Sequence, residues 1–406
     1  MSDEDESRPL LAASNVIDIG RASRPPSGST AMKLKRLLAW TTGVLAVVAV
    51  GVFAIGWFTS TNSCYTDPPV APRAPMKAVI RCDYGTAERL EIVNIEKPVP
   101  ADDEVLVKVR AAAVNPLDWH YLRGTPYLMR MGTGLRRPKE IRMGVDFAGT
   151  VMTVGRNVTR FKPGDAVFGG RTGAFAEYVT VKQDRAIALK PARVSFEQAG
   201  GVAIAATTAL QGLRDGGRVK AGDRVLINGA SGGVGTFAVQ IARSMDAHVT
   251  GVSSTRNVAL VRSLGAQDVV DYKRDDYTLV YSARGAPRFD AILDNVGNRT
   301  LAENRRVLVP GGRYVLIGGG GPDDGHWIGP MLKPLGAWAT SWFVDQHMGM
   351  LLAELTQKDT DLLRELMESG RVTPVVDRRY PLREIADAVR YVESGRARGK
   401  VVIVME

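Results

Sequence analysis

Alternating apolar and polar positions in the first half of the chain predict short β-strands. Residues 104–112, EVLVKVRAA, show the period-two pattern of a strand with one buried face. Glycines that favour turns separate further β-like segments at residues 76–80, 91–95, 144–154, 166–168 and 175–181. We therefore expect a mainly antiparallel β domain in this half of the chain.

From residue 195 onward the pattern changes to helices that alternate with short apolar strands. Strands are predicted at residues 224–228, 248–253, 268–271, 290–294 and 313–317, and helices at residues 198–214, 236–245 and 258–264. Such alternation is typical of a parallel sheet covered by helices. The predicted fold class is therefore α/β.

One apolar run belongs to neither pattern. Residues 37–58, LLAWTTGVLAVVAVGVFAIGWF, carry no charge and are long enough for a transmembrane helix, with Trp40 and Trp57 near the ends as interfacial anchors. The polar residues 1–36 predict a disordered N-terminal tail, and the proline-rich residues 59–75 predict a linker. A single-pass membrane protein, with the lipid bilayer as a partner through residues 37–58, is therefore expected.

Composition and charge exclude several classes of protein. The 406 residues are 45% hydrophobic and 24% charged, which is ordinary for globular chains. The formal charge is +10, but no basic run is interleaved with aromatic residues, so we expect no nucleic-acid partner. Two cysteines, Cys64 and Cys82, are too few for a disulfide scaffold or a four-cysteine zinc site.

A glycine-rich loop carries the clearest chemical signal. Gly229, Gly232 and Gly235 directly follow a predicted strand and open a predicted helix. Glycines allow a tight turn and a close approach of the backbone to a pyrophosphate, and the helix N-terminus offers free N–H groups. This pattern predicts a dinucleotide site.

The end of the next predicted strand indicates which dinucleotide binds. NAD-binding folds usually place an acidic residue there for the ribose hydroxyls, but this chain has Ser253, Ser254 and Arg256. Two hydroxyls and a cation suit the 2′-phosphate of NADPH. The alternative is that Arg256 merely starts the next helix.

Several ordered segments carry a family resemblance. They are AAAVNPLD from Ala111, GVDFAGTV from Gly144, FKPGDAVF from Phe161, GAFAEY from Gly173, NGASGGVG from Asn228 and GRARGKVV from Gly395. With them the chain resembles the medium-chain dehydrogenase/reductase superfamily, in its zinc-free quinone oxidoreductase branch, and within it the reticulon-interacting mitochondrial oxidoreductases. The resemblance implies a GroES-like catalytic domain at 76–196, completed by 341–406, and a Rossmann NADPH-binding domain at 197–340.

The resemblance also allows a test for zinc, position by position. Zinc-dependent relatives have Cys where this chain has Asn115 and His where it has Asp146, and their third ligand falls near residues 205–207, which include no Cys or His. Asn115 and Asp146 alone do not make a tetrahedral zinc site, so no metal is expected. The expected chemistry is hydride transfer from NADPH to a quinone or an α,β-unsaturated carbonyl.

Polar residues near the expected cleft are the candidates for catalysis. Asn115 would position the nicotinamide ribose or a carbonyl oxygen, and Tyr121 or Tyr127 would donate a proton to the developing enolate. His120 is a weaker candidate for the acid, because it is equally well explained as a loop residue, and Asp118 is better explained as holding its loop.

For the cofactor, the resemblance implies contacts with each part of NADPH. Ser231, Gly232, Gly233 and Val234 would meet the pyrophosphate, and Ser253, Ser254 and Arg256 the 2′-phosphate. Tyr272 would flank the adenine, and Asn295, Gly318 and Gly319 would face the nicotinamide side. Arg398 and Lys400 would reach the cofactor from the C-terminal segment, and the alternative for these two is that they are plain surface charges.

Two alternatives stay open at this point. A non-catalytic NADPH-binding membrane scaffold that kept the reductase fold would show the same nucleotide motif. The side of the membrane is also open, because NADPH favours the cytosol or matrix, whereas Lys33, Lys35 and Arg36 place the catalytic domain on the opposite side. A homodimer is left open as well.

Overall fold

The computed structural model describes residues 40–43, 47–48, 50–51, 53–66, 71–318, 336–337 and 340–405. It divides into two compact units, Met1–Trp57 and Phe58–Glu406. The predicted disordered tail at residues 1–36 lies outside the described residues, and so does Gly319, one of the residues predicted to bind the cofactor.

The predicted transmembrane helix at residues 37–58, and with it the single-pass membrane localisation, is wrong. None of the helices in the described part of the chain is long and apolar enough to cross a membrane. The described residues thus give no support for the lipid bilayer as a partner.

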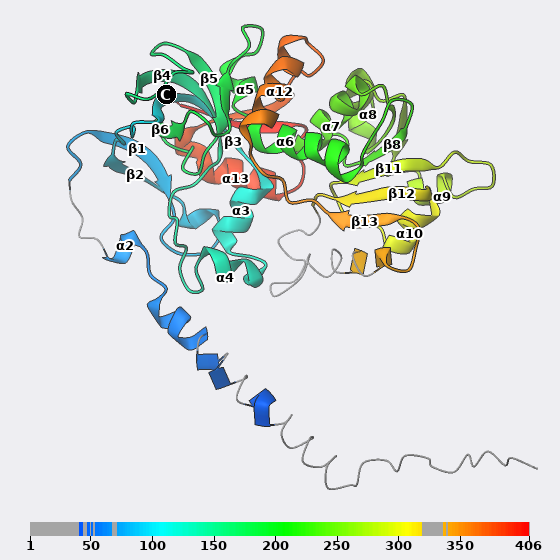
Figure 1. The fold of residues 1–406 in the computed structure, drawn as a ribbon, viewed down its shortest axis with the longest axis horizontal. Coiled ribbons are helices and arrows are strands. Elements are labelled where there is room, and N and C mark those ends of the chain that lie inside the picture. Colours follow the sequence, from blue (N-terminus) through cyan, green and yellow to red (C-terminus); the bar gives the residue numbers. More distant parts are fainter. Residues whose placement is uncertain are drawn as a thin grey trace, which may run out of the picture. The chain divides into compact units, whose positions relative to one another are not determined.

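Antiparallel strands build the first half of the larger unit (Figure 1). Its seven-stranded sheet has the order β14-β15-β3-β4-β5-β7, with β6 paired to β3, and only β14 and β15 pair in parallel along that order. The bounds are β3 Glu104–Val114, β4 Asp146–Val154, β5 Ala166–Gly170, β6 Tyr178–Lys182, β7 Ile187–Leu189, β14 Val376–Pro381 and β15 Lys400–Val404. A separate hairpin pairs β1 (Pro75–Ile80) with β2 (Glu91–Glu96).

Six parallel strands build the second half, in the order β10-β9-β8-β11-β12-β13. Their bounds are β8 Arg224–Asn228, β9 His248–Ser253, β10 Asp268–Asp271, β11 Phe289–Asp294, β12 Leu308–Leu316 and β13 His347–Met350. The order changes direction between β8 and β11, and ligands of such sheets bind where it does. The α/β fold class predicted from the sequence is confirmed.

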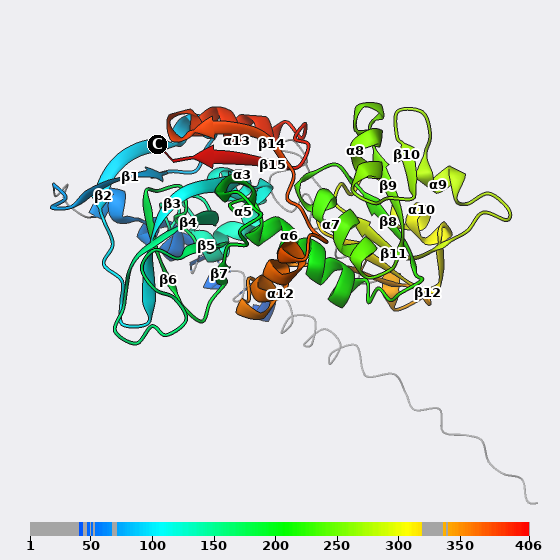
Figure 2. The same cartoon turned by 90° about the horizontal axis from the view of Figure 1, so that it is seen from above.

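Helices connect and cover these strands (Figure 2). Helix α6 packs on α7, and α7 packs on β8 and β9. The helices of four or more residues in the larger unit are α2 Ser63–Thr66, α3 Pro116–Arg123, α4 Arg130–Thr133, α5 Phe196–Ala199, α6 Ala203–Gln211, α7 Gly233–Ser244, α8 Val258–Ser263, α9 Tyr277–Val280, α10 Leu301–Arg306, α12 Gln357–Glu368 and α13 Ile385–Glu393.

The C-terminal segment returns to the antiparallel half. β15 pairs with β3 so that Val401 lies opposite Val114, and α12 packs on α6 and β7. In Figures 1 and 2 the red C-terminal strand accordingly lies against the cyan β3. Because the two strands are antiparallel, Lys400 at the start of β15 meets Asn115, which directly follows β3.

One hydrophobic core is shared by the two halves. It contains Phe168 of β5 and Ala188 of β7 together with Ala206 of α6 and Ile227 of β8, all at most 1% exposed. Close packing of this kind resists relative movement, because separating the halves would expose apolar surface to water. The shared core therefore fixes the position of the end of β3 relative to the end of β8.

Residues near the start of the larger unit are attached to the antiparallel half. Cys64 and Cys82 form a disulfide with Cα atoms 5.8 Å apart. The buried Asn62 donates from Nδ2 to the carbonyl oxygens of Cys82 at 2.8 Å and Pro138 at 3.0 Å. The first part of the predicted linker at residues 59–75 thus has defined contacts with the domain that follows it.

Candidate functional site

The glycine loop connects β8 to α7 and has a geometry that only glycine permits. Gly229 has a φ of +77°, and a Cβ at Gly235 would lie 2.1 Å from the Gly229 carbonyl oxygen. Helix α7 begins at Gly233, so its first N–H groups have no partner within the helix and can bind an anion. A Cβ at Gly232 or Gly233 would meet nothing closer than 3.4 Å, which leaves room beside the helix N-terminus.

Ser231 in this loop is held from two sides. Asn257 donates from Nδ2 to the Ser231 hydroxyl at 2.9 Å, and the Gly399 N–H donates to the Ser231 carbonyl oxygen at 3.0 Å. Asn257 is buried, and its Oδ1 has no hydrogen-bond partner among the described residues. Asn257 was not among the sequence candidates, because it lies four residues beyond the strand that carries the specificity signal.

The predicted 2′-phosphate residues lie at the end of β9. Ser253 is buried, whereas Arg256 is exposed and donates from Nη2 to the Arg396 carbonyl oxygen at 3.1 Å. Tyr272 lies beside them at the end of β10, where its N–H donates to the Ser253 carbonyl oxygen at 3.0 Å and its ring is half exposed. Ser253, Arg256 and Tyr272 are therefore brought together at one edge of the sheet.

The residues predicted to face the nicotinamide follow β11 and β12. Asn295 donates from Nδ2 to the Asn228 carbonyl oxygen at 2.8 Å, while its buried Oδ1 has no partner in the described part of the chain. Gly318 lies against Asn295, because a Cβ there would be 3.2 Å from the Asn295 carbonyl oxygen. Two unpartnered amide oxygens, of Asn257 and Asn295, and the open helix N-terminus fit a dinucleotide that extends across the loop.

A buried cation lies next to the glycine loop. Lys400, 3% exposed, donates from Nζ to Asn115 Oδ1 at 2.5 Å and to Asp146 Oδ2 at 3.3 Å. Asp146 also accepts from Asn115 Nδ2 at 3.1 Å and from the Ile204 N–H at 2.8 Å. A methyl group at Gly233 would be 3.5 Å from Lys400 Cδ, so the same side chain borders the nucleotide loop.

This cluster coincides with the positions examined for zinc. Asn115, Asp146 and the start of α6 meet, as the family resemblance implies, and the Lys400 ammonium lies among them. Within the described ranges, no group of three or more His, Cys, Asp or Glu side chains could hold a metal ion. One carboxamide, from Asn115, and one carboxylate, from Asp146, both bind the Lys400 amino group. This set does not match the ligands of a tetrahedral zinc site.

Asp118 supports Asn115 from the first turn of α3. Its Oδ2 accepts the Asn115 N–H at 2.7 Å. Burial raises the pKa of Asp118 to about 7, although the Asn115 N–H and the charges of Lys400 and Arg81 act in the opposite direction. Asp118 thus holds its loop, in the role that the sequence favoured for it.

The aromatic candidates lie on and after α3. Tyr121 and Tyr127 are half-buried, and the Arg130 Cζ lies 4.4 Å from the centroid of the Tyr127 ring. His120 stacks on Trp119, with 3.7 Å between ring centroids, and its Nδ1 lies 2.9 Å from the Thr125 carbonyl oxygen. Burial lowers the pKa of His120, which favours its neutral form and a structural role.

Arg398 is engaged elsewhere. Its backbone N–H donates to Asp377 Oδ2 at 2.9 Å, and its Nε forms an ion pair with Asp377 Oδ1 at 3.6 Å. Its predicted contact with a cofactor stays a prediction.

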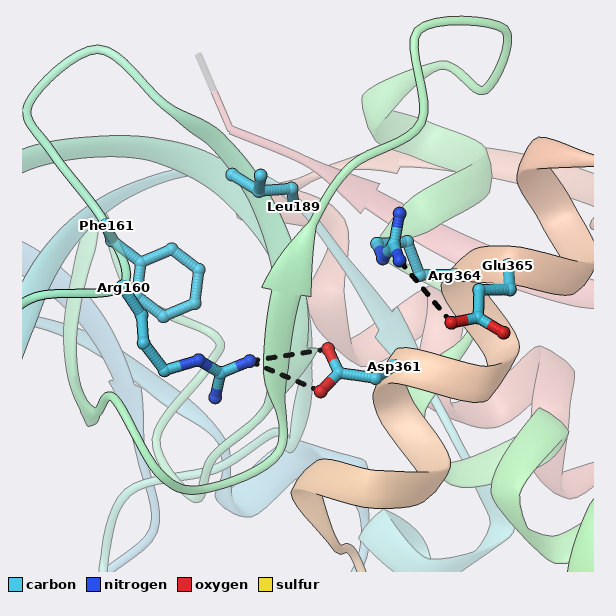
Figure 3. Close-up of a pocket in the computed structure, with 6 residues that line it drawn as sticks. All are labelled: Arg160, Phe161, Leu189, Asp361, Arg364 and Glu365. Atoms are coloured by element: carbon cyan, nitrogen blue, oxygen red, sulfur yellow. Dashed lines mark hydrogen bonds and ion pairs between the residues drawn. The ribbon is translucent and has the colours of Figure 1, made fainter.

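A surface pocket of about 450 Å³ lies away from these residues (Figure 3). Two ion pairs line it: Arg160 with Asp361 at 3.2 Å and Arg364 with Glu365 at 3.6 Å. Its walls come from α12, the end of β7 and the loop before β5, and none of its six residues is a site candidate. Because its charges are already paired, it offers no free group for the reaction.

Comparisons with known proteins agree with this arrangement. The family model described as alcohol dehydrogenase GroES-like domain matches residues 101–192, and the model described as zinc-binding dehydrogenase matches residues 264–403. The human mitochondrial NAD(P)H oxidoreductase RTN4IP1 is 34% identical over 374 residues, covering 82% of this chain and 90% of that protein. A quinone oxidoreductase of Lama guanicoe is 31% identical, covering 82% and 98%.

Other relatives and solved structures extend the comparison. A 2-methylene-furan-3-one reductase of Solanum lycopersicum is 31% identical, covering 83% of this chain and 81% of its own. The structure of a Coxiella burnetii quinone oxidoreductase superposes with a TM-score of 0.69 at 27% identity, covering 82% of this chain and all of that one. An Escherichia coli quinone oxidoreductase, solved in complex with NADPH, shares the fold with a TM-score of 0.68 at 24% identity, covering 81% and 99%.

Proposed function

This chain belongs to the medium-chain dehydrogenase/reductase superfamily, and we propose that it is a zinc-independent reductase of quinones or α,β-unsaturated carbonyls that prefers NADPH. It is an NAD(P)H-dependent oxidoreductase, like the relatives that cover most of its length. The observation that supports the proposal is that Lys400 binds Asn115 and borders Gly233 of the glycine loop, so that the polar cluster proposed for the acceptor lies next to the loop proposed for the dinucleotide.

The residues of the glycine loop and β9 would hold the cofactor. The N–H groups at the start of α7, with Ser231, would bind the pyrophosphate, and Ser254 and Arg256 would bind the 2′-phosphate. Asn295 Oδ1, buried and without a partner among the described residues, would accept a hydrogen bond from the nicotinamide end. When bound, NADPH supplies the hydride, so the protein needs to provide orientation and polarisation.

Lys400 accounts for the proposed independence from zinc. Its Nζ lies at the point where the resemblance places the metal of zinc-dependent relatives, and it donates to Asn115 Oδ1 and Asp146 Oδ2. The Nδ2 group of Asn115 is in turn oriented by Asp146 at 3.1 Å. Nδ2 also donates to the Ala113 carbonyl oxygen at 3.3 Å, and we propose that this network of Asn115, Asp146 and Lys400 shapes the acceptor side in place of a metal ion.

The proton that follows the hydride would come from a tyrosine hydroxyl. Tyr121 lies in α3 and Tyr127 follows it, and both are half-buried, so part of each side chain is open to solvent. The proposed domains, 76–196 with 341–406 and 197–340, and a homodimer stay predictions.

Turnover by the full chain tests the proposal. NADPH consumption should be measured with a panel of quinones and enones, before and after dialysis against a chelator. We expect turnover with at least one acceptor and no loss after chelation. Absence of turnover with every acceptor despite NADPH binding would favour a non-catalytic protein, and activity restored by added zinc would contradict metal independence.

A matched pair of glycine variants controls for the nucleotide site. Gly235→Ala brings a methyl group within 2.1 Å of the Gly229 carbonyl oxygen and should abolish NADPH binding, whereas Gly349→Ala meets nothing within 4 Å and should leave binding unchanged. Turnover that survives Gly235→Ala would show that the reaction does not use this loop.

A further inference from the structure

Arg81 is a buried cation that the proposed reaction does not use. It directly follows β1 and is 3% exposed. Neither its Nε nor its Nη1 has a hydrogen-bond partner in the part of the chain that the structure describes. A guanidinium has five N–H donors, and burying any of them without an acceptor is unfavourable. The arrangement therefore requires an explanation.

The two carboxylates whose charges act most strongly on Arg81, those of Asp118 and Glu140, form hydrogen bonds with other groups. Asp118 accepts the backbone N–H of Asn115, and Glu140 accepts from the backbone N–H and Nε of Arg142 at 3.1 and 3.2 Å. Burial lowers the pKa of Arg81 to about 10, so the group is still a cation at neutral pH. Arg81 thus keeps its charge without a carboxylate partner among the described residues.

Tyrosine rings form the surroundings of this cation. The Arg81 Cζ lies 5.5 Å from the centroid of the Tyr84 ring and 6.0 Å from that of Tyr121. A second cation, Arg130, lies 4.3 Å from the centroid of the Tyr84 ring. All of these tyrosines are half-buried, so solvent reaches part of each. The guanidinium groups of Arg81 and Arg130 thus lie beside the rings of Tyr84 and Tyr121 and form a positively charged, aromatic cluster.

Helix α3 connects this place to the proposed reaction site. Asn115 precedes its first turn and binds Lys400, and Tyr121 lies in its last turn and borders Arg81. Six residues of helix separate the two, a rise of about 9 Å. Asn115 and the surroundings of Arg81 thus lie at opposite ends of one short helix.

We propose that Arg81 binds a carboxylate of the acceptor, so that the preferred substrates are unsaturated carbonyl compounds that carry an acid group. Carboxylate oxygens are the acceptors that best satisfy a guanidinium. The aromatic rings of Tyr84 and Tyr121 contact the flat conjugated part of such a molecule. This inference rests on the proposed reductase function and adds the chemical class of its substrate.

A matched pair of acceptors provides the test. trans-3-Benzoylacrylate and its methyl ester have the same enone, and only the first carries a charge. For the unaltered full chain we expect kcat/KM to be higher for the acid by about tenfold or more, the value of one charge-assisted hydrogen bond. Arg81→Met should remove this preference by lowering kcat/KM for the acid alone, and Arg81→Lys should retain part of it.

A binding measurement separates recognition from folding and from catalysis. The saturated product 3-benzoylpropionate should bind the NADP⁺-loaded full chain in calorimetry, and Arg81→Met should weaken that binding by about tenfold. Arg142→Met, which alters an arginine that is already paired with Glu140, is the matched control and should leave it unchanged. If Arg81→Met fails to fold, Arg81→Lys tests the same contact with the charge kept.

The outcomes distinguish this inference from the proposed function. Equal kcat/KM for the acid and the ester, or an equal effect of Arg81→Met on both, would overturn the role of Arg81 while leaving the reductase intact. No turnover of either acceptor, together with binding of 3-benzoylpropionate that depends on Arg81, would support the carboxylate site and contradict the reductase proposal. Binding that does not depend on Arg81 would overturn the inference.

Discussion

The nucleotide side and the acceptor side of this protein are built in different ways. The nucleotide side comes from one continuous stretch, in which the glycine loop, Ser253, Arg256 and Tyr272 follow one another along neighbouring parallel strands. The acceptor side brings together Arg81, Asn115, Asp146 and Lys400 from four separated segments. A local motif can identify the first, whereas only long-range strand pairing creates the second.

The two sides also differ in how they treat charge. Arg256 on the nucleotide side is exposed, as suits a residue that meets a charged ligand from solvent. On the acceptor side, Lys400, Asp146 and Asp118 are each at most 3% exposed and are held by hydrogen bonds inside the protein, whereas the buried Arg81 has no carboxylate partner among the described residues. Substitutions on the acceptor side should therefore change stability and catalysis together, whereas those on the nucleotide side should change mainly affinity.

The largest effect is expected at Lys400, where the two sides meet. Lys400→Met leaves the Asp146 carboxylate buried without its cation and should reduce the free energy of unfolding by about 3 to 5 kcal/mol. It should also lower kcat much more than it weakens NADPH binding, because Asn115 loses its positioning partner. Chemical denaturation and steady-state kinetics measure the two effects.

Two further variants sharpen this result. The double variant Lys400→Met with Asp146→Asn removes the unpaired charge and should recover much of the stability without recovering kcat. Lys162→Met, at an exposed lysine, is the matched control and should change neither quantity. Full recovery of kcat in the double variant would show that Lys400 has only a structural role.

An intermediate effect is expected at Asp118, through its raised pKa. Burial raises the pKa of Asp118 to about 7 in the folded protein, whereas an unfolded chain has an Asp pKa of about 3.9. Between these values the folded state holds a proton that the unfolded state has released, so the free energy of unfolding falls as pH rises through this window. The loss should be about 4 kcal/mol.

Denaturation of the unaltered protein and of Asp118→Asn from about pH 4 to pH 8 measures this loss. The amide is neutral at every pH and still accepts the Asn115 N–H, so the variant should lack this part of the pH dependence. A difference in stability between the two proteins that stays constant with pH would show that Asp118 is ionised in the fold.

The smallest effect is expected on the nucleotide side, at Arg256. Arg256→Ala should weaken NADPH binding by about tenfold, the value of one exposed charge-assisted contact, with little change for NADH. Arg262→Ala, an exposed arginine of the same region, is the control. Equal weakening of NADPH and NADH binding would show that Arg256 does not contact the 2′-phosphate. If the binding of neither cofactor weakens, Arg256 does not belong to the cofactor site.

Elements with a strong local signal could be predicted closely. Strands β8, β9 and β10 have the bounds expected from their short runs; β8 and β9 are almost wholly buried, whereas β10 is a half-buried edge strand. The helix expected at residues 198–214 is instead divided into α5, α6 and a π-helical turn at Gly212–Gly216. β13 was not predicted, because His347–Met350 becomes a strand only by pairing with β12.

The apolar run at residues 37–58 is a case in which a strong local signal gave a wrong prediction. Its hydropathy and length satisfy the sequence criterion for a membrane span, but among the described residues no helix meets the criterion in the structure. Similarly, counting two cysteines excluded a scaffold but did not indicate that Cys64 and Cys82 pair, since that depends on the position of the segment before β1.

The sequence by itself determined the α/β class, the glycine loop and the absence of an acidic residue at the end of β9, because each depends on neighbouring positions along the chain. Only the tertiary structure decided that Lys400 meets Asn115 and Asp146, and that Arg81 lies buried among tyrosines. The physical reason is that buried charges are placed by strand pairing across hundreds of residues, and no local pattern encodes which partner a buried cation will meet.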